Sequence, residues 1–150
     1  MMDQQPFGAP LTGGEALVKA LIDSKITHVF GIPGTHTVPL YTAMEKYSNL
    51  GRIQHITTRH EQGAGYAAEG FARASKDENA IAAVCTIPGC GVTNVLTPMA
   101  SAFADSIPMI VISAEVPDYW LGKPTRQFSH QVNGMGGDYG GQFRKGECSY

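Results

Sequence analysis

Two apolar runs limit what this chain can fold into more than any other feature of its sequence. Residues 79–87, NAIAAVCTI, and residues 107–116, IPMIVISAEV, are bounded by turn-forming residues and show little alternation of polar and apolar positions. Strands of this kind have both faces covered, which is typical of parallel sheets that carry helices on both sides. The two runs therefore predict an α/β fold around a buried, mostly parallel sheet.

Helical and extended segments alternate over the rest of the chain. Thr12 and Glu15 stand at capping-box spacing at the head of a helix, whose apolar stripe we expect at Leu17, Ala20 and Leu21. An opening helix followed by strand, helix, strand, helix, strand, helix and strand predicts a doubly wound sheet, flanked by helices on both faces. The other elements are expected as strands over 27–32 and 52–59 and as helices over 36–51, Glu61–Ser75 and, after a glycine turn in 88–94, to about Asp105.

We expect one domain over residues 1–131 and a glycine-rich irregular tail over residues 132–150. Glycine recurs throughout the tail, VNGMGGDYGGQFRKGECSY, and no helical or strand period continues into it. The tail is therefore not expected to join the packed core.

Charge and cysteine content argue against several classes of protein. The net charge of −2 and the pI near 6.2 give no electrostatic reason to expect a nucleic acid or a membrane surface as partner. No apolar run approaches the roughly 20 residues that cross a bilayer, and residues 1–18 lack the basic start of a signal peptide. Because the three cysteines show no paired spacing, a reducing compartment suits them, and we expect a cytoplasmic protein.

Three polar or glycine-containing segments follow the first three expected strands. They are GIPGTH (31–36), RHEQ (59–62) and PGCGVTN (88–94). Ligands of open parallel sheets bind at the carboxyl ends of the strands, where such segments gather. The sequence therefore predicts a ligand site at this edge.

Glu61 is the candidate for acid–base chemistry within these segments. At the start of its helix, the helix dipole favours the ionised carboxylate, whereas burial under a ligand opposes ionisation. An acid under both influences can share a proton with a ligand near neutral pH. The alternative is a simple capping acid in the first helical turn.

The helix after Glu61 is made largely of glycine and alanine. Three glycines in it, Gly63, Gly65 and Gly70, each cost about 1 kcal/mol relative to alanine, so the close approach of a backbone or a flat ligand would have to offset them. Tight packing against the protein's own sheet is the other explanation. We expect Tyr66 and Phe71 to point toward the core.

Other motifs are weak. Neither GIPG nor GCG matches a P-loop or a dinucleotide-binding glycine pattern, and the five histidines and three cysteines lack metal-ligand spacing. We therefore expect no metal site on this chain.

Four segments in register resemble the N-terminal, pyrimidine-binding domain of thiamine-diphosphate-dependent enzymes. They are GGEALVKALIDSKITHVFGIPGTHTVPLY, TRHEQGAGYAAEGFARAS, GCGVTNVLTPMASAFADSIPMIVIS and LGKPTRQFSHQ, in order over roughly residues 11–131. The resemblance is to the acetolactate synthase and 2-oxo-acid decarboxylase branch, including guanidino-oxopentanoate decarboxylases. It implies thiamine diphosphate as cofactor, a 2-oxo acid as substrate, and a lyase or transferase activity.

The resemblance also implies roles for individual residues. Glu61 would be the catalytic acid, hydrogen-bonded to N1′ of the aminopyrimidine ring. Pro33 and Gly34 would line the pyrimidine pocket, with Asn94 beside them. Residues expected on the substrate side are Thr35, His36 and Gln131.

The chain departs from the family pattern in two ways. The third loop reads Pro88-Gly89-Cys90-Gly91 where the family has Thr-Gly-Pro-Gly, and the sequence has no Gly-Asp-Gly…Asn-Asn motif for Mg²⁺ and diphosphate. The resemblance therefore implies a Mg²⁺ site on another domain or chain, and a homodimer or a partner subunit that carries it. Two functions remain open: a pyrimidine-binding domain that needs this second part for catalysis, or a truncated, non-catalytic dimerisation or regulatory module.

Overall fold

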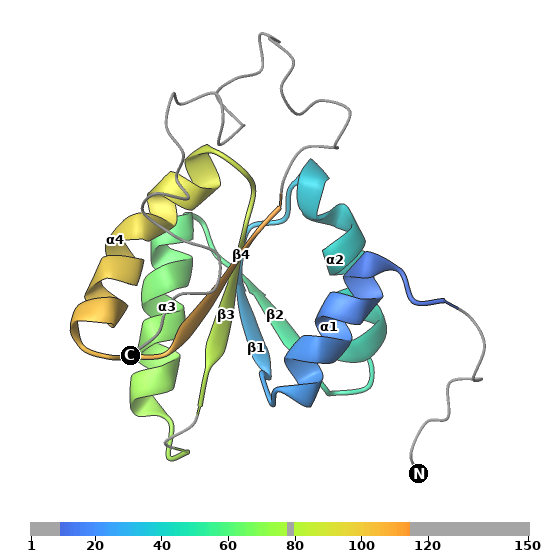
Figure 1. The fold of residues 1–150 in the computed structure, drawn as a ribbon, viewed down its shortest axis with the longest axis horizontal. Helices are drawn as coiled ribbons and strands as arrows, with labels where there is room; N and C mark the ends of the chain where they lie inside the picture. The colour runs from blue at the N-terminus through green and yellow to red at the C-terminus, as the bar shows by residue number, and fades with distance from the viewer. Residues whose placement is uncertain (1–9, 78–79, 115–150) are drawn as a thin grey trace, which may run out of the picture.

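The computed structural model describes residues 10–77 and 80–114 (Figure 1). Every expected helix and strand is present there. The helix expected over Glu61–Ser75 is one residue shorter than that range, and the strands and the helix expected over 36–51 are shorter by more. The expected tail over 132–150, the segment LGKPTRQFSHQ and Gln131 lie outside the described residues. The elements are α1 (Gly13–Asp23), β1 (His28–Gly31), a 3-10 turn η1 (Thr35–Thr37), α2 (Val38–Ser48), β2 (Gln54–Thr57), α3 (Glu61–Ala74), β3 (Ala82–Thr86), α4 (Cys90–Ala104) and β4 (Met109–Ser113).

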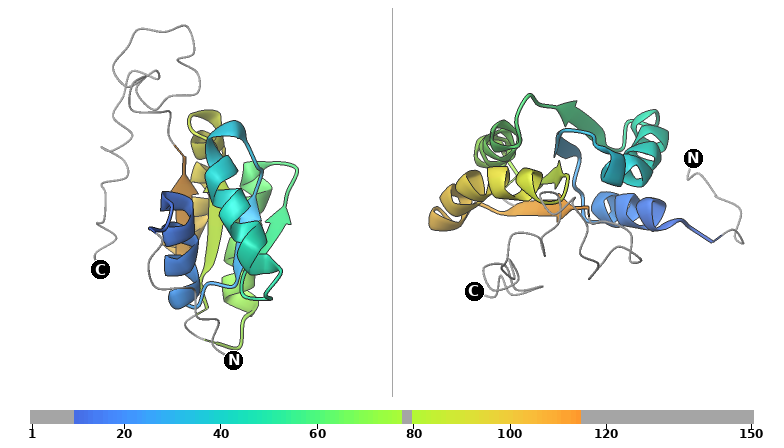
Figure 2. Two further views of the ribbon diagram at one scale, coloured as in Figure 1. Left: turned by 90° about the vertical axis from the view of Figure 1, so that its right-hand side faces the viewer. Right: turned by 90° about the horizontal axis from the view of Figure 1, so that it is seen from above.

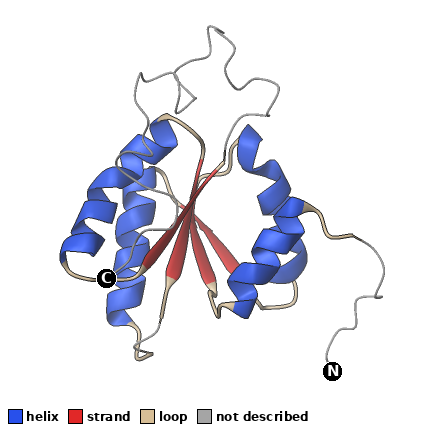
Figure 3. Cartoon of the chain, viewed as in Figure 1, coloured by secondary structure: helices blue, strands red, loops and turns tan. Residues whose placement is uncertain are grey.

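The strands of the described residues form one four-stranded sheet in the order β2-β1-β3-β4, and every neighbouring pair is parallel. Helices α1 and α2 lie on one face and α3 and α4 on the other, as Figures 2 and 3 show from different sides. The predicted α/β fold, with helices on both faces of a parallel sheet, is confirmed. None of the helices in residues 10–77 and 80–114 is long and apolar enough to span a membrane.

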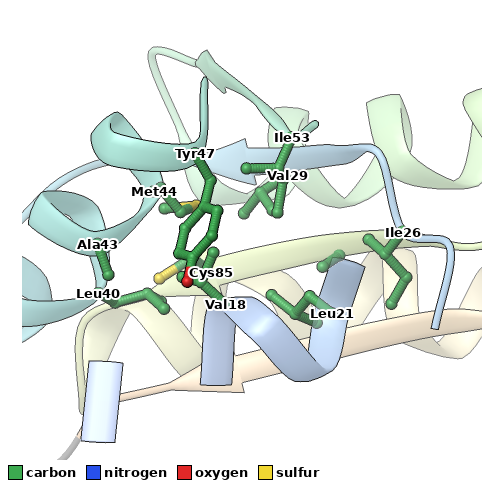
Figure 4. Close-up of a cluster of buried hydrophobic side chains, with 11 residues drawn as sticks. Val18, Leu21, Ile26, Val29, Leu40, Ala43, Met44, Tyr47, Ile53 and Cys85 are labelled. Atoms are coloured by element: carbon green, nitrogen blue, oxygen red, sulfur yellow. The ribbon is translucent and has the colours of Figure 1, made fainter. Parts of the chain in front are cut away.

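Strand β3 is buried along its whole length, and its side chains alternate between two hydrophobic cores. Ala83 and Cys85 join the core beneath α1 and α2, whereas Ala82 and Val84 join the core beneath α3 and α4. Alternation of this kind follows from the two-residue period of a strand. The first core is shown in Figure 4, where side chains of both helices gather over the sheet: Val18, Leu21, Leu40, Ala43, Met44 and Tyr47.

The predicted apolar stripe of α1 is partly wrong. Leu21 is buried as expected, but Leu17 and Ala20 are exposed, and Val18 is buried in their place. The reason lies at Gly14, where an added Cβ would come within 2.9 Å of the backbone carbonyl carbon of Pro39. This close approach turns the face that carries residues 14, 18 and 21 toward α2.

The expectation for the aromatic residues of α3 is half right. Phe71 packs against the second core, and its ring lies 4.5 Å from that of His28. Tyr66 instead is 46% exposed, so the prediction that it points toward the core is wrong. The buried positions Ala64 and Ala68 precede Phe71 by seven and three residues, a spacing that keeps all three on one helical face, whereas Tyr66 lies on another face.

The three glycines of α3 have different surroundings. A Cβ on Gly65 would come within 2.7 Å of Cβ of Pro98 and 3.1 Å of Cγ2 of Val95, both on α4, whereas Gly63 and Gly70 have nothing within 4 Å of that position. Only Gly65 therefore serves close helix packing. We expect Gly65→Ala to lower the free energy of unfolding by about 1–3 kcal/mol, because the proline ring cannot move aside.

The other two glycines are matched controls within the same helix. Gly63→Ala and Gly70→Ala should each raise the free energy of unfolding, by up to about 1 kcal/mol, because alanine favours the helix and meets no neighbour. Urea denaturation of the three variants measures both effects. Equal stability changes at all three positions would contradict the close packing of α3 on α4.

Candidate functional site

The loops after β1 and β3 meet at the carboxyl edge of the sheet. The strand order reverses between these two strands, because the chain passes from β1 to β2 on one side and then to β3 on the other. Such a reversal is where ligands bind in doubly wound folds. The side chain of Ile87 packs against both loops: a Cβ on Gly34 would overlap its Cγ2, and a Cβ on Gly91 would lie 2.9 Å from its Cγ1.

Glu61 is the first residue of α3 and lies at this edge. It is only 8% exposed, and its Oε2 accepts a hydrogen bond of 3.0 Å from Nδ2 of Asn94 on α4. Within residues 10–77 and 80–114 no hydrogen bond reaches its other oxygen, Oε1. A Cβ on Gly91 would lie 3.7 Å from Oε1, so the bare backbone of α4 leaves room beside this oxygen.

Glu61 lies in the first turn of α3, but the side-chain cap of this helix is made by its neighbour. His60 is the N-cap of α3, and its Nδ1 accepts a hydrogen bond of 3.2 Å from the backbone N–H of Gln62. The Glu61 carboxylate is directed to Asn94 instead. The structure thus brings together two of the residues singled out in the sequence, which are 33 positions apart.

Pro33, Gly34 and Thr35 line a hollow of about 430 Å³ on the α2 side of the same edge. The loop is fixed by Thr37, whose Oγ1 donates to the carbonyl of Gly34 (2.8 Å) and accepts from its N–H (2.9 Å). The remaining lining residues are Val38, Tyr41, Thr42 and Glu45.

The other predicted site residues are not brought to this hollow. Glu61, Asn94 and the half-buried His36 are not among its lining residues. Gln131, as noted, lies outside the described part of the chain.

Tyr41, which lines the hollow, has two ionisable neighbours: His55, half-buried like Tyr41 itself, and the fully buried Cys85. The ring of Tyr41 meets that of His55 edge-on at 4.6 Å. Burial raises the pKa of Tyr41 and lowers the pKa of His55, because each charged form would lose hydration. Burial also raises the pKa of the Cys85 thiol to about 11, with a smaller opposing effect from the Tyr41 hydroxyl, so this cysteine is a thiol at neutral pH.

Besides Thr37, which holds the loop at Gly34, sequence reasoning missed two buried polar residues. Glu69 is 5% exposed, and its Oε1 accepts hydrogen bonds from Arg73 (2.6 and 3.1 Å) and from the Ser101 hydroxyl (3.1 Å). Arg73 also pairs with Asp105, and both carboxylates raise its pKa, Glu69 most strongly. The i,i+4 spacing of Glu69 and Arg73 was the available signal. The second missed residue, Thr86, is fully buried at the end of β3.

Metal-ligating side chains do not gather in the described ranges. Among residues 10–77 and 80–114, no group of three or more His, Cys, Asp or Glu side chains is close enough to hold a metal ion.

Comparison with known proteins gives the family. Residues 11–136 match the family described as "Thiamine pyrophosphate enzyme, N-terminal TPP binding domain". The chain is 46% identical over 114 residues to the probable 2-ketoarginine decarboxylase AruI of Pseudomonas aeruginosa, an alignment that covers 75% of this chain and 19% of the relative.

Acetolactate synthases are similar as well. Identity is 36% over 122 residues to that of Arthrospira platensis (81% of this chain, 21% of the relative) and 42% over 112 residues to the mitochondrial catalytic subunit of Saccharomyces cerevisiae (75% and 15%). The alignments thus cover between 15% and 21% of the length of these curated relatives. The matched family accounts for most of the chain, which therefore belongs to the thiamine pyrophosphate enzymes and corresponds to their N-terminal TPP binding domain.

Proposed function

We propose that this chain binds the aminopyrimidine half of thiamine diphosphate through Glu61, as the N-terminal domain of a 2-oxo-acid decarboxylase or an acetolactate-synthase-like enzyme. The observation that carries the proposal is the buried Glu61 carboxylate, of which Oε2 is held by Asn94 while Oε1 accepts no hydrogen bond from the described residues. A carboxylate held in this way can share a proton with a weakly basic ring nitrogen, and its hydrogen bonds are strengthened by a dry setting.

The residues around Glu61 fit a flat heterocycle. A side chain at position 91 would crowd Ile87 and Thr86. Because this residue is glycine, the space beside Oε1 of Glu61 stays open. Asn94 would orient the carboxylate, while Pro33 and Gly34 would bound the ring from the first loop. When bound, thiamine diphosphate would supply a thiazolium that accepts the electron pair released on decarboxylation.

Catalysis would also need a diphosphate-binding part. The sequence has no Gly-Asp-Gly…Asn-Asn motif, and the described residues hold no cluster of metal ligands. We place Mg²⁺ and the diphosphate on another domain or on a partner subunit. The outward face of α3, with Gly63, Gly70 and the exposed Tyr66, supports a subunit contact and leaves a homodimer or partner subunit as part of the proposal.

The names of the relatives support a proposal for the substrate class. One is named a probable 2-ketoarginine decarboxylase and others are acetolactate synthases. We propose a 2-oxo acid as substrate. A guanidino 2-oxo acid is the first compound to test, because identity is higher to the decarboxylase than to the two synthases.

Binding of a cofactor fragment tests the proposal without any second domain. The full 150-residue chain, isotopically labelled, would be titrated with hydroxymethyl-aminopyrimidine, the pyrimidine half of thiamine, and followed by NMR. We expect saturable shifts of the Asn94 side-chain amide and of the Gly91 backbone amide.

Hydroxyethylthiazole, the other half of thiamine, is the matched control and should leave these signals in place. Absence of shifts with the pyrimidine would contradict pyrimidine binding. It would favour the alternative, a non-catalytic dimerisation or regulatory module of the same fold. The native mass of its complex would then show whether the chain pairs with itself or with another protein.

A further inference from the structure

The hydroxyl of Thr86 is a buried polar group without a partner in the described part of the chain. Thr86 ends β3 and is 0% exposed, and its Oγ1 has no hydrogen-bond partner within residues 10–77 and 80–114. Buried hydroxyls are normally hydrogen-bonded, because an unpaired one destabilises the fold. Valine has nearly the same shape and would fill this place without an unpaired hydroxyl. The hydroxyl therefore calls for an explanation other than folding.

Thr86 lies beside the carboxylate of the proposed site. Strand alternation directs it to the same face as Ala82 and Val84, toward α3 and α4. The position that a Cβ on Gly91 would occupy is 3.2 Å from Cβ of Thr86 and 3.7 Å from Oε1 of Glu61. The side chain of Thr86 and Oε1 of Glu61 thus both lie next to the position that Gly91 leaves without a side chain.

We propose that Thr86 is a positioning residue for Glu61, and that its hydroxyl donates a hydrogen bond to Oε1 when a ligand engages the carboxylate. The inference rests on the proposed pyrimidine site and adds a residue to it. A carboxylate oxygen accepts two hydrogen bonds, so Oε1 can bind the hydroxyl and a ligand N–H together. With Asn94 on Oε2 and Thr86 on Oε1, the carboxylate plane is fixed from both sides.

Thr37 shows how a buried threonine behaves when its hydroxyl is satisfied. It is 2% exposed, and its Oγ1 makes two hydrogen bonds to the backbone of Gly34. Replacing Thr37 with valine removes bonds present in the free chain, whereas replacing Thr86 with valine removes none. The two substitutions should therefore have opposite effects on stability.

The test compares Thr86→Val, Thr86→Ser and Thr37→Val in the full chain. For Thr86→Val we expect an unchanged or higher melting temperature, and a Kd for hydroxymethyl-aminopyrimidine that rises about tenfold, because a hydrogen bond to a charged group is lost. Thr86→Ser should restore the affinity while melting at a slightly lower temperature, because it keeps the hydroxyl and loses a buried methyl group. Thr37→Val should lower the melting temperature.

The outcomes separate the two proposals. If the unmodified chain does not bind the pyrimidine, both the proposed function and this inference are overturned. If the unmodified chain and Thr86→Val bind it equally, only the inference is overturned. A fall in melting temperature for Thr86→Val as large as that for Thr37→Val would also overturn it, because the hydroxyl would then serve folding.

Discussion

Replacing Glu61 with glutamine is expected to lower 2-oxo-acid turnover by at least about 100-fold, the lower range for loss of a group that acts in proton transfer. Glutamine has the shape of glutamate and retains an oxygen that can accept from Asn94. It cannot give a proton to a ring nitrogen or take one back. Because the substitution also removes a buried carboxylate, the melting temperature should stay the same or rise.

Turnover would be measured as CO₂ release, with the chain combined with a diphosphate-binding domain or subunit, thiamine diphosphate and Mg²⁺. Asp23→Asn is the matched control, since Asp23 is an exposed carboxylate at the end of α1 that pairs only with Lys19 among the described residues. It should keep full activity. If Glu61→Gln retained activity comparable to Asp23→Asn, Glu61 would not be the catalytic acid.

The largest effect on stability is expected from Gly31→Ala. Gly31 ends β1 beside Cys85 of β3, at a φ of 155° that side chains rarely adopt, and an added Cβ would overlap the carbonyl oxygen of Cys85. Relief would require the two central strands to separate. We expect a loss of at least about 3 kcal/mol, at the upper end for overpacking and a large part of the about 5–15 kcal/mol that stabilises a domain.

Urea denaturation monitored by circular dichroism measures this loss, with Gly13→Ala as control because a Cβ on Gly13 meets nothing within 4 Å. The control should change the free energy of unfolding by less than about 1 kcal/mol. A change equally small for Gly31→Ala would show that β1 and β3 lie further apart at their carboxyl ends than described here.

The order and type of the elements could be predicted because each depends on a local pattern. Continuous apolar runs marked β3 and β4, and the capping box that indicated the start of α1 is present between Thr12 and Glu15. The expectation that both faces of β4 are covered is wrong, because β4 is the last strand in the order β2-β1-β3-β4 and its Ile110 is 36% exposed. It was harder to predict which face of each helix is exposed. Leu17 and Tyr66 are as hydrophobic as their buried neighbours, and only the close approaches at Gly14 and Gly65 decide which side faces inward.

The sequence predicted those parts of the candidate site that lie at the starts of helices and the ends of strands. Glu61 and Asn94 were singled out separately, but their hydrogen bond depends on how α3 crosses α4. Glu69 and Thr86 were missed for a related reason. A glutamate in a helix and a threonine in a strand are ordinary residues, and only their burial, together with the partners that Glu69 has and Thr86 lacks, makes them notable.

The contact of Gly65 with Pro98 has a consequence for the carboxylate above it. Glu61 precedes Gly65 by four residues and Asn94 precedes Pro98 by four, so each member of the hydrogen-bonded pair lies about 6 Å, one helical turn, from the tightest point of the crossing. Sliding either helix along its axis would move the amide away from the acid, and the interlocked glycine and proline oppose such sliding. The alignment of the pair is therefore set by the helix crossing, which leaves the surrounding loops free to diverge toward new substrates without realigning the acid.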